Sequence, residues 1–90
     1  MSLNENRIEK MRERLIASLE PDLLEIIDDS ARHAGHAGAK TGLGHFKMII
    51  SSAAFTGKSP IARHRLVYRS LGEMMQADIH ALNIDARLPG

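Results

Sequence analysis

The amino-acid sequence predicts a small α+β domain in which helices cover one face of a three-stranded mixed sheet. Helical spacing of apolar residues marks the first 20 residues and residues 59–75, whereas apolar and polar residues alternate near 46–51 and over 79–87. A glycine-rich hairpin is expected between the first two strands and a helix between the last two. The first pair should therefore be antiparallel, and the second pair parallel with a right-handed crossover.

Length and composition limit the classes of protein to consider. The chain has 90 residues, no cysteine and a formal charge of +1, and its pI is near 8.2. We expect one domain, residues 1–90, with any metal held by histidine, by carboxylate or by ligands from a partner. The charge is far below that of a dedicated nucleic-acid binder. Without a long apolar run or a signal peptide, a cytoplasmic location and no membrane contact are expected.

A capping signal opens the first helix. Ser2 and Glu5 match a capping box, in which the two side chains satisfy each other's backbone N–H groups. The helix is expected to continue until Pro21 interrupts the pattern. After it, the short aliphatic stretch Leu23–Asp28 is predicted to be the first strand. The residues expected on the inward stripe of the helix are Ile8, Met11, Leu15 and Leu19.

The stretch between Ser30 and His45 is rich in glycine and is predicted to form a long hairpin loop. It carries His33 and His36, and His45 opens the next strand. A loop of this length in so small a domain is often functional. Histidines exposed in a glycine-rich loop are also commonly only solvated, so both interpretations stand at this point.

The second strand leads through a turn into a helix. Phe46, Met48 and Ile50 alternate with more polar residues, which predicts a strand with one buried face. A turn is expected at 55–58, followed by an N-cap at Ser59 and a proline in the first helical turn at Pro60. Arg69 is placed to pair with Glu73 one turn further on. The residues predicted to form the apolar stripe of this helix are Ile61, His64, Tyr68, Leu71 and Met75.

A turn at residues 76–78 is expected before the last strand, Ile79–Arg87. In this strand His80 is predicted to share one face with Leu82, Ile84 and Ala86. If the last two strands are parallel, their first residues lie at one edge of the sheet, where the hairpin loop also arrives. His80 is then expected to lie close to His45 and to the loop histidines.

Four histidines at one sheet edge suit a metal, because neutral imidazole binds iron, copper and zinc. His80 as an ordinary residue at the rim of the core is an equally good interpretation, and His64 within an apolar stripe is better explained by packing. No nucleophile elbow or phosphate-binding loop is present, so no enzymatic activity is expected. A second group of residues is basic and lies near the start of the predicted helix: Lys58, Arg63, Arg65 and Arg69. The helix dipole favours phosphate binding there. A solvated basic face explains these residues as well.

Read together, these stretches resemble the BolA-like family over nearly the whole chain. The resemblance rests on Arg7-Ile8-Glu9, Leu24–Ser30, His45-Phe46-Lys47, Phe55-x-Gly57, Arg63–Tyr68 and His80-Ala81-Leu82. The family's fold is similar to the class II KH arrangement, with the order helix-strand-strand-helix-helix-strand. This order agrees with the one predicted above and adds a short helical turn within residues 52–60.

The resemblance implies a partner rather than a reaction. BolA-like proteins pair with monothiol glutaredoxins and share a bridging 2Fe-2S cluster, to which the partner contributes its own cysteine and a glutathione thiolate. In this sequence His80 matches the family's C-terminal histidine ligand, and His33 matches the ligand of the hairpin loop, with His36 as a rival. No cofactor is expected in the isolated protein, and no small-molecule substrate.

The family is also associated with transcription regulation and stress response, which implies an alternative function as a KH-like DNA-binding regulator. The basic residues at 58, 63, 65 and 69 would then contact phosphates. A GxxG backbone clamp is not evident at residues 55–60, which disfavours RNA binding by the KH route.

Overall fold

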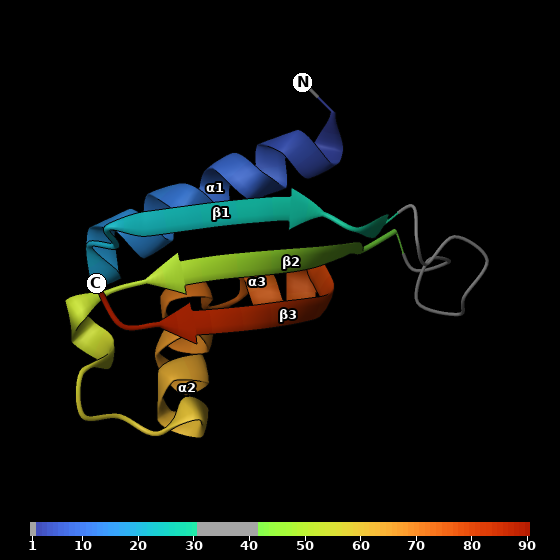
Figure 1. Ribbon diagram of the computed structural model, residues 1–90. Coiled ribbons are helices and arrows are strands. Elements are labelled where there is room, and N and C mark those ends of the chain that lie inside the picture. The colour runs from blue at the N-terminus through green and yellow to red at the C-terminus, as the bar shows by residue number, and fades with distance from the viewer. Residues whose placement is uncertain (1, 31–41) are drawn as a thin grey trace.

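The computed structural model describes residues 2–30 and 42–90 of the chain. Its elements confirm the predicted order, and the first and last strands have the predicted bounds. The 3-10 helix η3 lies within the segment where the resemblance implied a short helical turn. In chain order the elements are α1 (Leu3–Leu19), β1 (Leu23–Asp28), β2 (Gly44–Ser51), η3 (Ala53–Phe55), α2 (Pro60–Leu71), α3 (Met74–Ala77) and β3 (Ile79–Arg87) (Figure 1).

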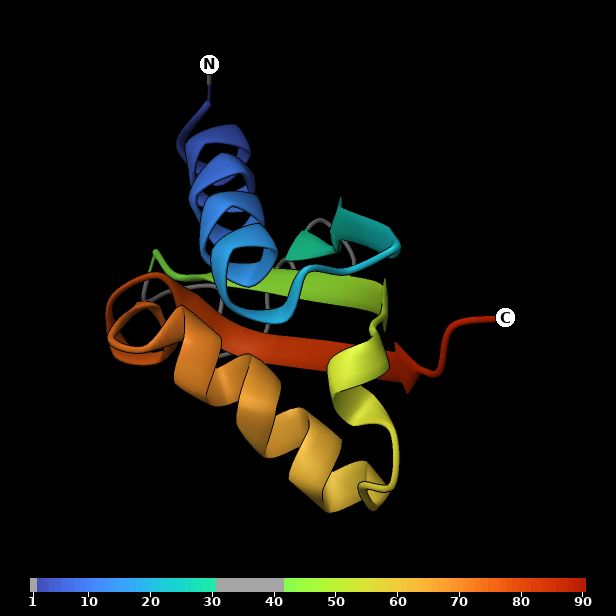
Figure 2. The same ribbon diagram turned by 90° about the vertical axis from the view of Figure 1, so that its left-hand side faces the viewer.

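The sheet has the order β1-β2-β3. β1 and β2 are antiparallel, and β2 and β3 are parallel, as the expected hairpin and helical crossover predicted. α1 and α2 lie on the same side of this sheet (Figure 2). As a result, β1 ends at the edge of the sheet where β2 and β3 both begin (Figure 1).

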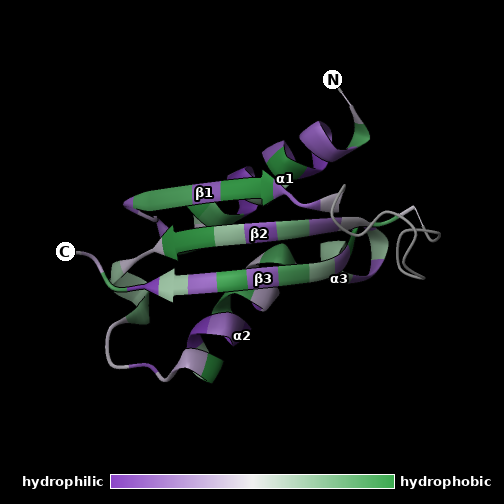
Figure 3. Cartoon of the chain, turned by 45° about the vertical axis from the view of Figure 1, so that its right-hand side comes forward, coloured by the Kyte–Doolittle hydropathy of each residue, from purple (hydrophilic) through white to green (hydrophobic). Residues whose placement is uncertain are grey.

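The hydrophobic core fills the space between the sheet and the helices. Phe46, Met48 and Ile50 of β2 point into it, as their alternation predicted, and Phe55 of η3 is wholly buried. Figure 3 shows apolar and polar residues alternating along much of β3, whereas β1 is mostly apolar. Within residues 2–30 and 42–90, no helix combines the length and the apolar character needed to cross a membrane.

Both long helices begin at serine caps. The Ser2 hydroxyl accepts a hydrogen bond from the Glu5 backbone N–H at 3.1 Å, which confirms the serine half of the predicted capping box. The Ser59 hydroxyl accepts from the Ala62 backbone N–H at 3.2 Å, and Pro60 stands in the first turn of α2 as predicted. These caps fix the residue at which each helix begins.

The predicted apolar stripe of α2 was partly wrong. Leu71 is buried, but Ile61 is 65% exposed and Tyr68 is 40% exposed, whereas Val67 is wholly buried in their place. Two stripes of this helix share Leu71, and the spacing of apolar residues does not indicate which of them faces the sheet. The crossing of α2 over the sheet selects the stripe that contains Val67.

Two expectations for the end of α2 were also wrong. Glu73 is bound by Arg14 of α1, not by Arg69: both of its carboxylate oxygens accept hydrogen bonds from the Arg14 guanidinium, at 3.1 and 2.5 Å. The same guanidinium donates to the Leu71 carbonyl at 2.6 Å, so it also caps the end of α2. The expected turn at residues 76–78 is instead entered through the short helix α3.

Candidate functional site

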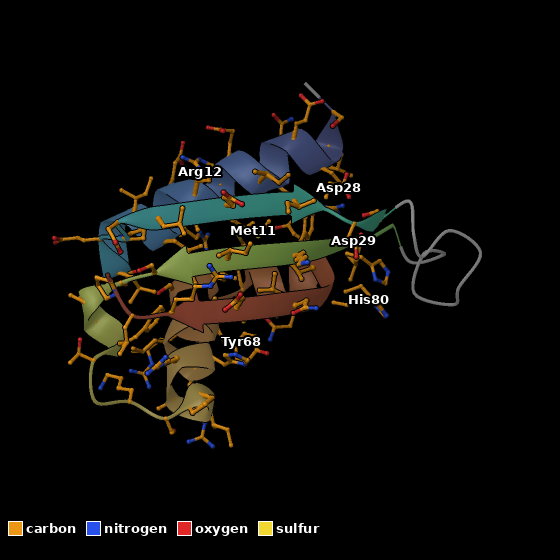
Figure 4. All side chains as sticks on the ribbon, in the orientation of Figure 1. Met11, Arg12, Asp28, Asp29, Tyr68 and His80 are labelled. Atoms are coloured by element: carbon orange, nitrogen blue, oxygen red, sulfur yellow. The ribbon has the colours of Figure 1, made fainter. Side chains whose placement is uncertain are left out.

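The predicted convergence of chain segments occurs at one end of the sheet. Asp28 and Asp29, at the end of β1, and His80, at the start of β3, lie at this same end (Figure 4). The first residues of β2 pair with the first residues of β3, since Gly44 is opposite Ile79. The parallel crossover therefore brings together residues that are far apart in the sequence.

His80 and His45 lie next to each other at this edge, as the sequence predicted. Their ring centroids are 4.9 Å apart and the ring planes are inclined by 48°. His45 is buried, at 5% exposure, whereas His80 is exposed. The pair thus presents one accessible imidazole, backed by a second one.

The predicted alternation of β3 was wrong at its first residues. The register pairs Gly44 with Ile79 but His45 with Ala81, so His80 is an extra residue in a β-bulge. The bulge shifts the alternation, which buries Ile79 and exposes His80. His80 therefore does not share the inward face of Leu82.

The loop ligands expected from the resemblance, His33 and His36, lie outside the described residues. Among residues 2–30 and 42–90, no group of three or more histidine and carboxylate side chains is arranged to hold a metal ion. Of the metal ligands expected from the sequence, the structure therefore places His80 alone. Its imidazole is exposed, and imidazole is a side chain that can bind iron, copper or zinc.

A buried arginine ties α1 to this edge. Arg7 is only 8% exposed, and its guanidinium donates to the Asp78 carboxylate at 3.2 Å, to the Asn4 side-chain oxygen at 2.9 Å and to the Gly42 carbonyl at 3.0 Å. The Asp78 carbonyl in turn accepts the Gly44 backbone N–H at 3.0 Å. One side chain of α1 thereby links the residue before β3 with the chain that leads into β2.

Asn4 extends these contacts to the end of β1. Its side-chain amide donates to the Asp28 carboxylate at 3.1 Å and to the Ser30 hydroxyl at 3.2 Å, and the same hydroxyl accepts the His45 backbone N–H at 3.0 Å. Partial burial acts to raise the pKa of Asp28, but the hydrogen bonds from Ser30 and Asn4 outweigh it and lower that pKa. The carboxylate is thus kept charged as an acceptor in this cluster.

The sequence reasoning missed Arg7 and Asn4 as parts of the site. Arg7 precedes Met11 and Leu15 at steps of four, which places it on the inward stripe of α1, and this spacing was the available signal. An arginine on a buried stripe requires acceptors from elsewhere in the fold. Those acceptors lie in sequence as far away as Asp78 and were not predictable from α1 alone.

The four basic residues proposed for phosphate contacts differ in their surroundings: three are exposed, and one forms hydrogen bonds within the fold. Lys58, Arg65 and Arg69 are exposed. Arg63 instead donates to the carbonyls of Lys58, at 2.9 Å, and of Ala86, at 3.2 Å, and so connects the start of α2 with the end of β3. Arg63 therefore has a structural role in addition to its charge.

Comparisons with known proteins agree on one family. The family model for BolA-like proteins matches residues 15–90. The chloroplastic protein BOLA1 of Arabidopsis thaliana is 46% identical over 88 residues, which cover 94% of this chain and 55% of that protein. The DNA-binding transcriptional regulator BolA of Escherichia coli (strain K12) is 39% identical over 74 residues, which cover 82% of this chain and 68% of that protein.

Solved structures show the same fold. The BolA domain of SufE1 from Arabidopsis thaliana superimposes with a TM-score of 0.80 at 42% sequence identity, and the match covers 92% of each chain. The chain spans about half the length of the curated plant BOLA1 protein that it matches. The extent of the family match and the similarity in fold show that the chain belongs to the BolA-like family.

Proposed function

We propose that this chain is a non-enzymatic interaction protein that binds a monothiol glutaredoxin and shares a bridging 2Fe-2S cluster with it, in iron-sulfur cluster trafficking or iron sensing. The observation that carries the proposal is the exposed imidazole of His80 at the sheet edge, backed by His45. The stretch that contains His33 and His36 starts and ends at this same edge, since Ser30 and Gly42 flank it and both contact the cluster around Arg7 and Asn4. His33 is proposed as the second ligand, with His36 as its rival.

The ligand chemistry of the chain supports a shared cluster rather than one held by this protein alone. Iron-sulfur clusters are held mainly by thiolates, and this chain has no cysteine. A partner must therefore supply the thiolates, while imidazole from this chain completes the coordination. When bound, the cluster would supply iron for delivery or a signal of iron status. Imidazole ligands must be neutral, so the shared cluster should be less stable at acidic pH.

Reconstitution with a glutaredoxin tests the proposal. The chain is mixed with a monothiol glutaredoxin, glutathione, iron and sulfide, and the visible circular dichroism of the mixture is recorded. The wild-type chain should change the spectrum of the glutaredoxin cluster, and His80→Ala should remove that change. The matched control is His64→Ala, because this imidazole lies on α2 next to Tyr68 instead of at the sheet edge. Equal spectra for the wild type and His80→Ala would contradict the proposal.

The same measurement decides between the two loop histidines. His33→Ala should weaken the spectral change, whereas His36→Ala should leave it intact. If His36→Ala alone weakens it, the second ligand is His36.

DNA binding is a second candidate function, favoured by the name of the Escherichia coli relative and by the exposed basic residues of α2. Duplex affinity should then fall steeply with salt, and Arg65→Ala and Arg69→Ala should each reduce the salt slope by about one. Arg63→Ala should also lower stability, because Arg63 connects α2 to β3. A flat salt response would exclude this function.

A further inference from the structure

We propose that Arg7 is a positioning residue of the site: from α1 it holds the start of β3 against the start of β2, so that His80 stays beside His45. The inference rests on the proposed function only where it treats His80 as a ligand. Arg7 itself is buried and acts through the residues that it binds.

The bulge makes the position of His80 depend on its surroundings. Regular pairing joins Gly44 to Ile79 and His45 to Ala81, so no residue of β2 is directly opposite His80. An extra residue of this kind locally disrupts the ladder. The placement of His80 must therefore come from contacts on either side of the bulge.

Asp78 supplies such a contact on one side. It stands two residues before His80 and binds in two directions: its carbonyl accepts the Gly44 N–H at 3.0 Å, and its carboxylate accepts the Arg7 guanidinium at 3.2 Å. Gly44 directly precedes His45. The first of these bonds joins the backbones that carry the two imidazoles. Through the second bond, Arg7 holds Asp78 in the orientation that permits the first.

The shape of arginine explains why this residue type occupies the position. Its planar guanidinium presents several donors in a fixed fork, and here they reach Asn4, Gly42 and Asp78 at once. A lysine could keep the charge but not these separate directions. Arg7 thereby also fixes Gly42, one of the two residues nearest to the stretch with His33 and His36.

The first test uses the protein alone. In the wild type, the ring protons of His45 and His80 should give a nuclear Overhauser cross-peak, because the rings are in contact. Arg7→Met, which keeps the length of the side chain, should lose this cross-peak, and Arg7→Lys should weaken it. The matched control is Arg14→Met. Arg14 is another arginine of α1 and forms an ion pair with Glu73, so this variant also loses an ion pair but should keep the cross-peak.

The second test measures the functional consequence. In the reconstituted complex with glutaredoxin and glutathione, the chelator concentration that removes half of the cluster should fall about tenfold for Arg7→Met, which is typical of residues that orient a ligand. Arg14→Met should leave it unchanged. The visible circular dichroism of the Arg7→Met complex should also shift towards that of His80→Ala.

Each outcome decides the inference. A retained cross-peak in Arg7→Met overturns it, and so does an equal loss in Arg14→Met, which would indicate general loosening. If Arg7→Met does not fold, Asp78→Ala removes the same ion pair and is judged by the same criteria. A lost cross-peak with unchanged chelator resistance also overturns the role of Arg7 at the cluster. If His80→Ala has no effect on the cluster, the proposed function fails, while the cross-peak still decides whether Arg7 positions the two rings.

Discussion

Gly44 packs so closely against Phe46 that a single added methyl group should destabilise the fold. A Cβ atom at Gly44 would lie 2.3 Å from Cε2 and 2.4 Å from Cζ of the Phe46 ring. Carbon atoms in good contact are about 3.5–4.0 Å apart, so the ring or the backbone would have to move by about 1 Å. Phe46 is only 2% exposed, and its ring is packed within the hydrophobic core. Overpacking of this kind should lower the free energy of unfolding by about 1–3 kcal/mol.

Urea unfolding followed by far-UV circular dichroism measures this loss for Gly44→Ala. The midpoint of thermal unfolding should fall by about 4–8 °C for each kcal/mol in a domain of this size. Phe46→Leu removes the two ring atoms that would clash, so Gly44→Ala should cost less in that background, by about 0.5–3 kcal/mol.

Gly57→Ala is the control for this double-mutant cycle. Gly57 has a φ of +76° and nothing within 4 Å of an added Cβ, so its substitution costs backbone strain alone. That cost should be equal with Phe46 and with Leu at position 46. If the effects of Gly44→Ala and Phe46→Leu simply add, the added methyl group does not clash with the Phe46 ring.

Three further predictions concern stability. Ser52→Ala should lower the free energy of unfolding in urea by about 1–3 kcal/mol, because the buried Ser52 hydroxyl donates to the Leu19 carbonyl and accepts from the Ala54 N–H. Ser51→Ala is the control and should be nearly neutral, because the buried Ser51 hydroxyl has no hydrogen-bond partner in the described part of the chain. Equal losses for the two variants would contradict this prediction. The hydrogen bond from Arg14 lowers the pKa of Glu73 from 4.5 to about 2, so this pair stabilises the fold above about pH 4.5 and the contribution is lost as the pH falls towards 2. Unfolding curves across this window should therefore be less pH-dependent for Glu73→Gln than for the wild type, and parallel dependences would argue against the pair. Phe55→Ala should cost about 3–5 kcal/mol, since the ring is wholly buried, and a loss below about 1 kcal/mol would mean that the core closes around the gap.

Much of the candidate site was predictable because it follows from topology. Alternation located Ile79–Arg87, and the helix before it required a parallel pairing with β2. That pairing brings the first residues of β3, His80 among them, to the end of the sheet where His45 lies. The bulge at His80 was missed, although the two successive apolar residues Ala81 and Leu82 shift the alternation of the strand by one position. The position of the extra residue is decided by the pairing of Gly44 with Ile79 and of His45 with Ala81.

The sequence by itself determined the local elements of this protein, since helical spacing, strand alternation and serine caps act between residues a few positions apart. Only the tertiary structure decided which stripe of α2 is buried and where Arg7 and Arg14 find their acceptors. Those partners are 71 and 59 residues away along the chain. A buried guanidinium binds whichever acceptors the fold brings within reach, and that choice depends on how the helices cross the sheet rather than on the residues beside it in the sequence.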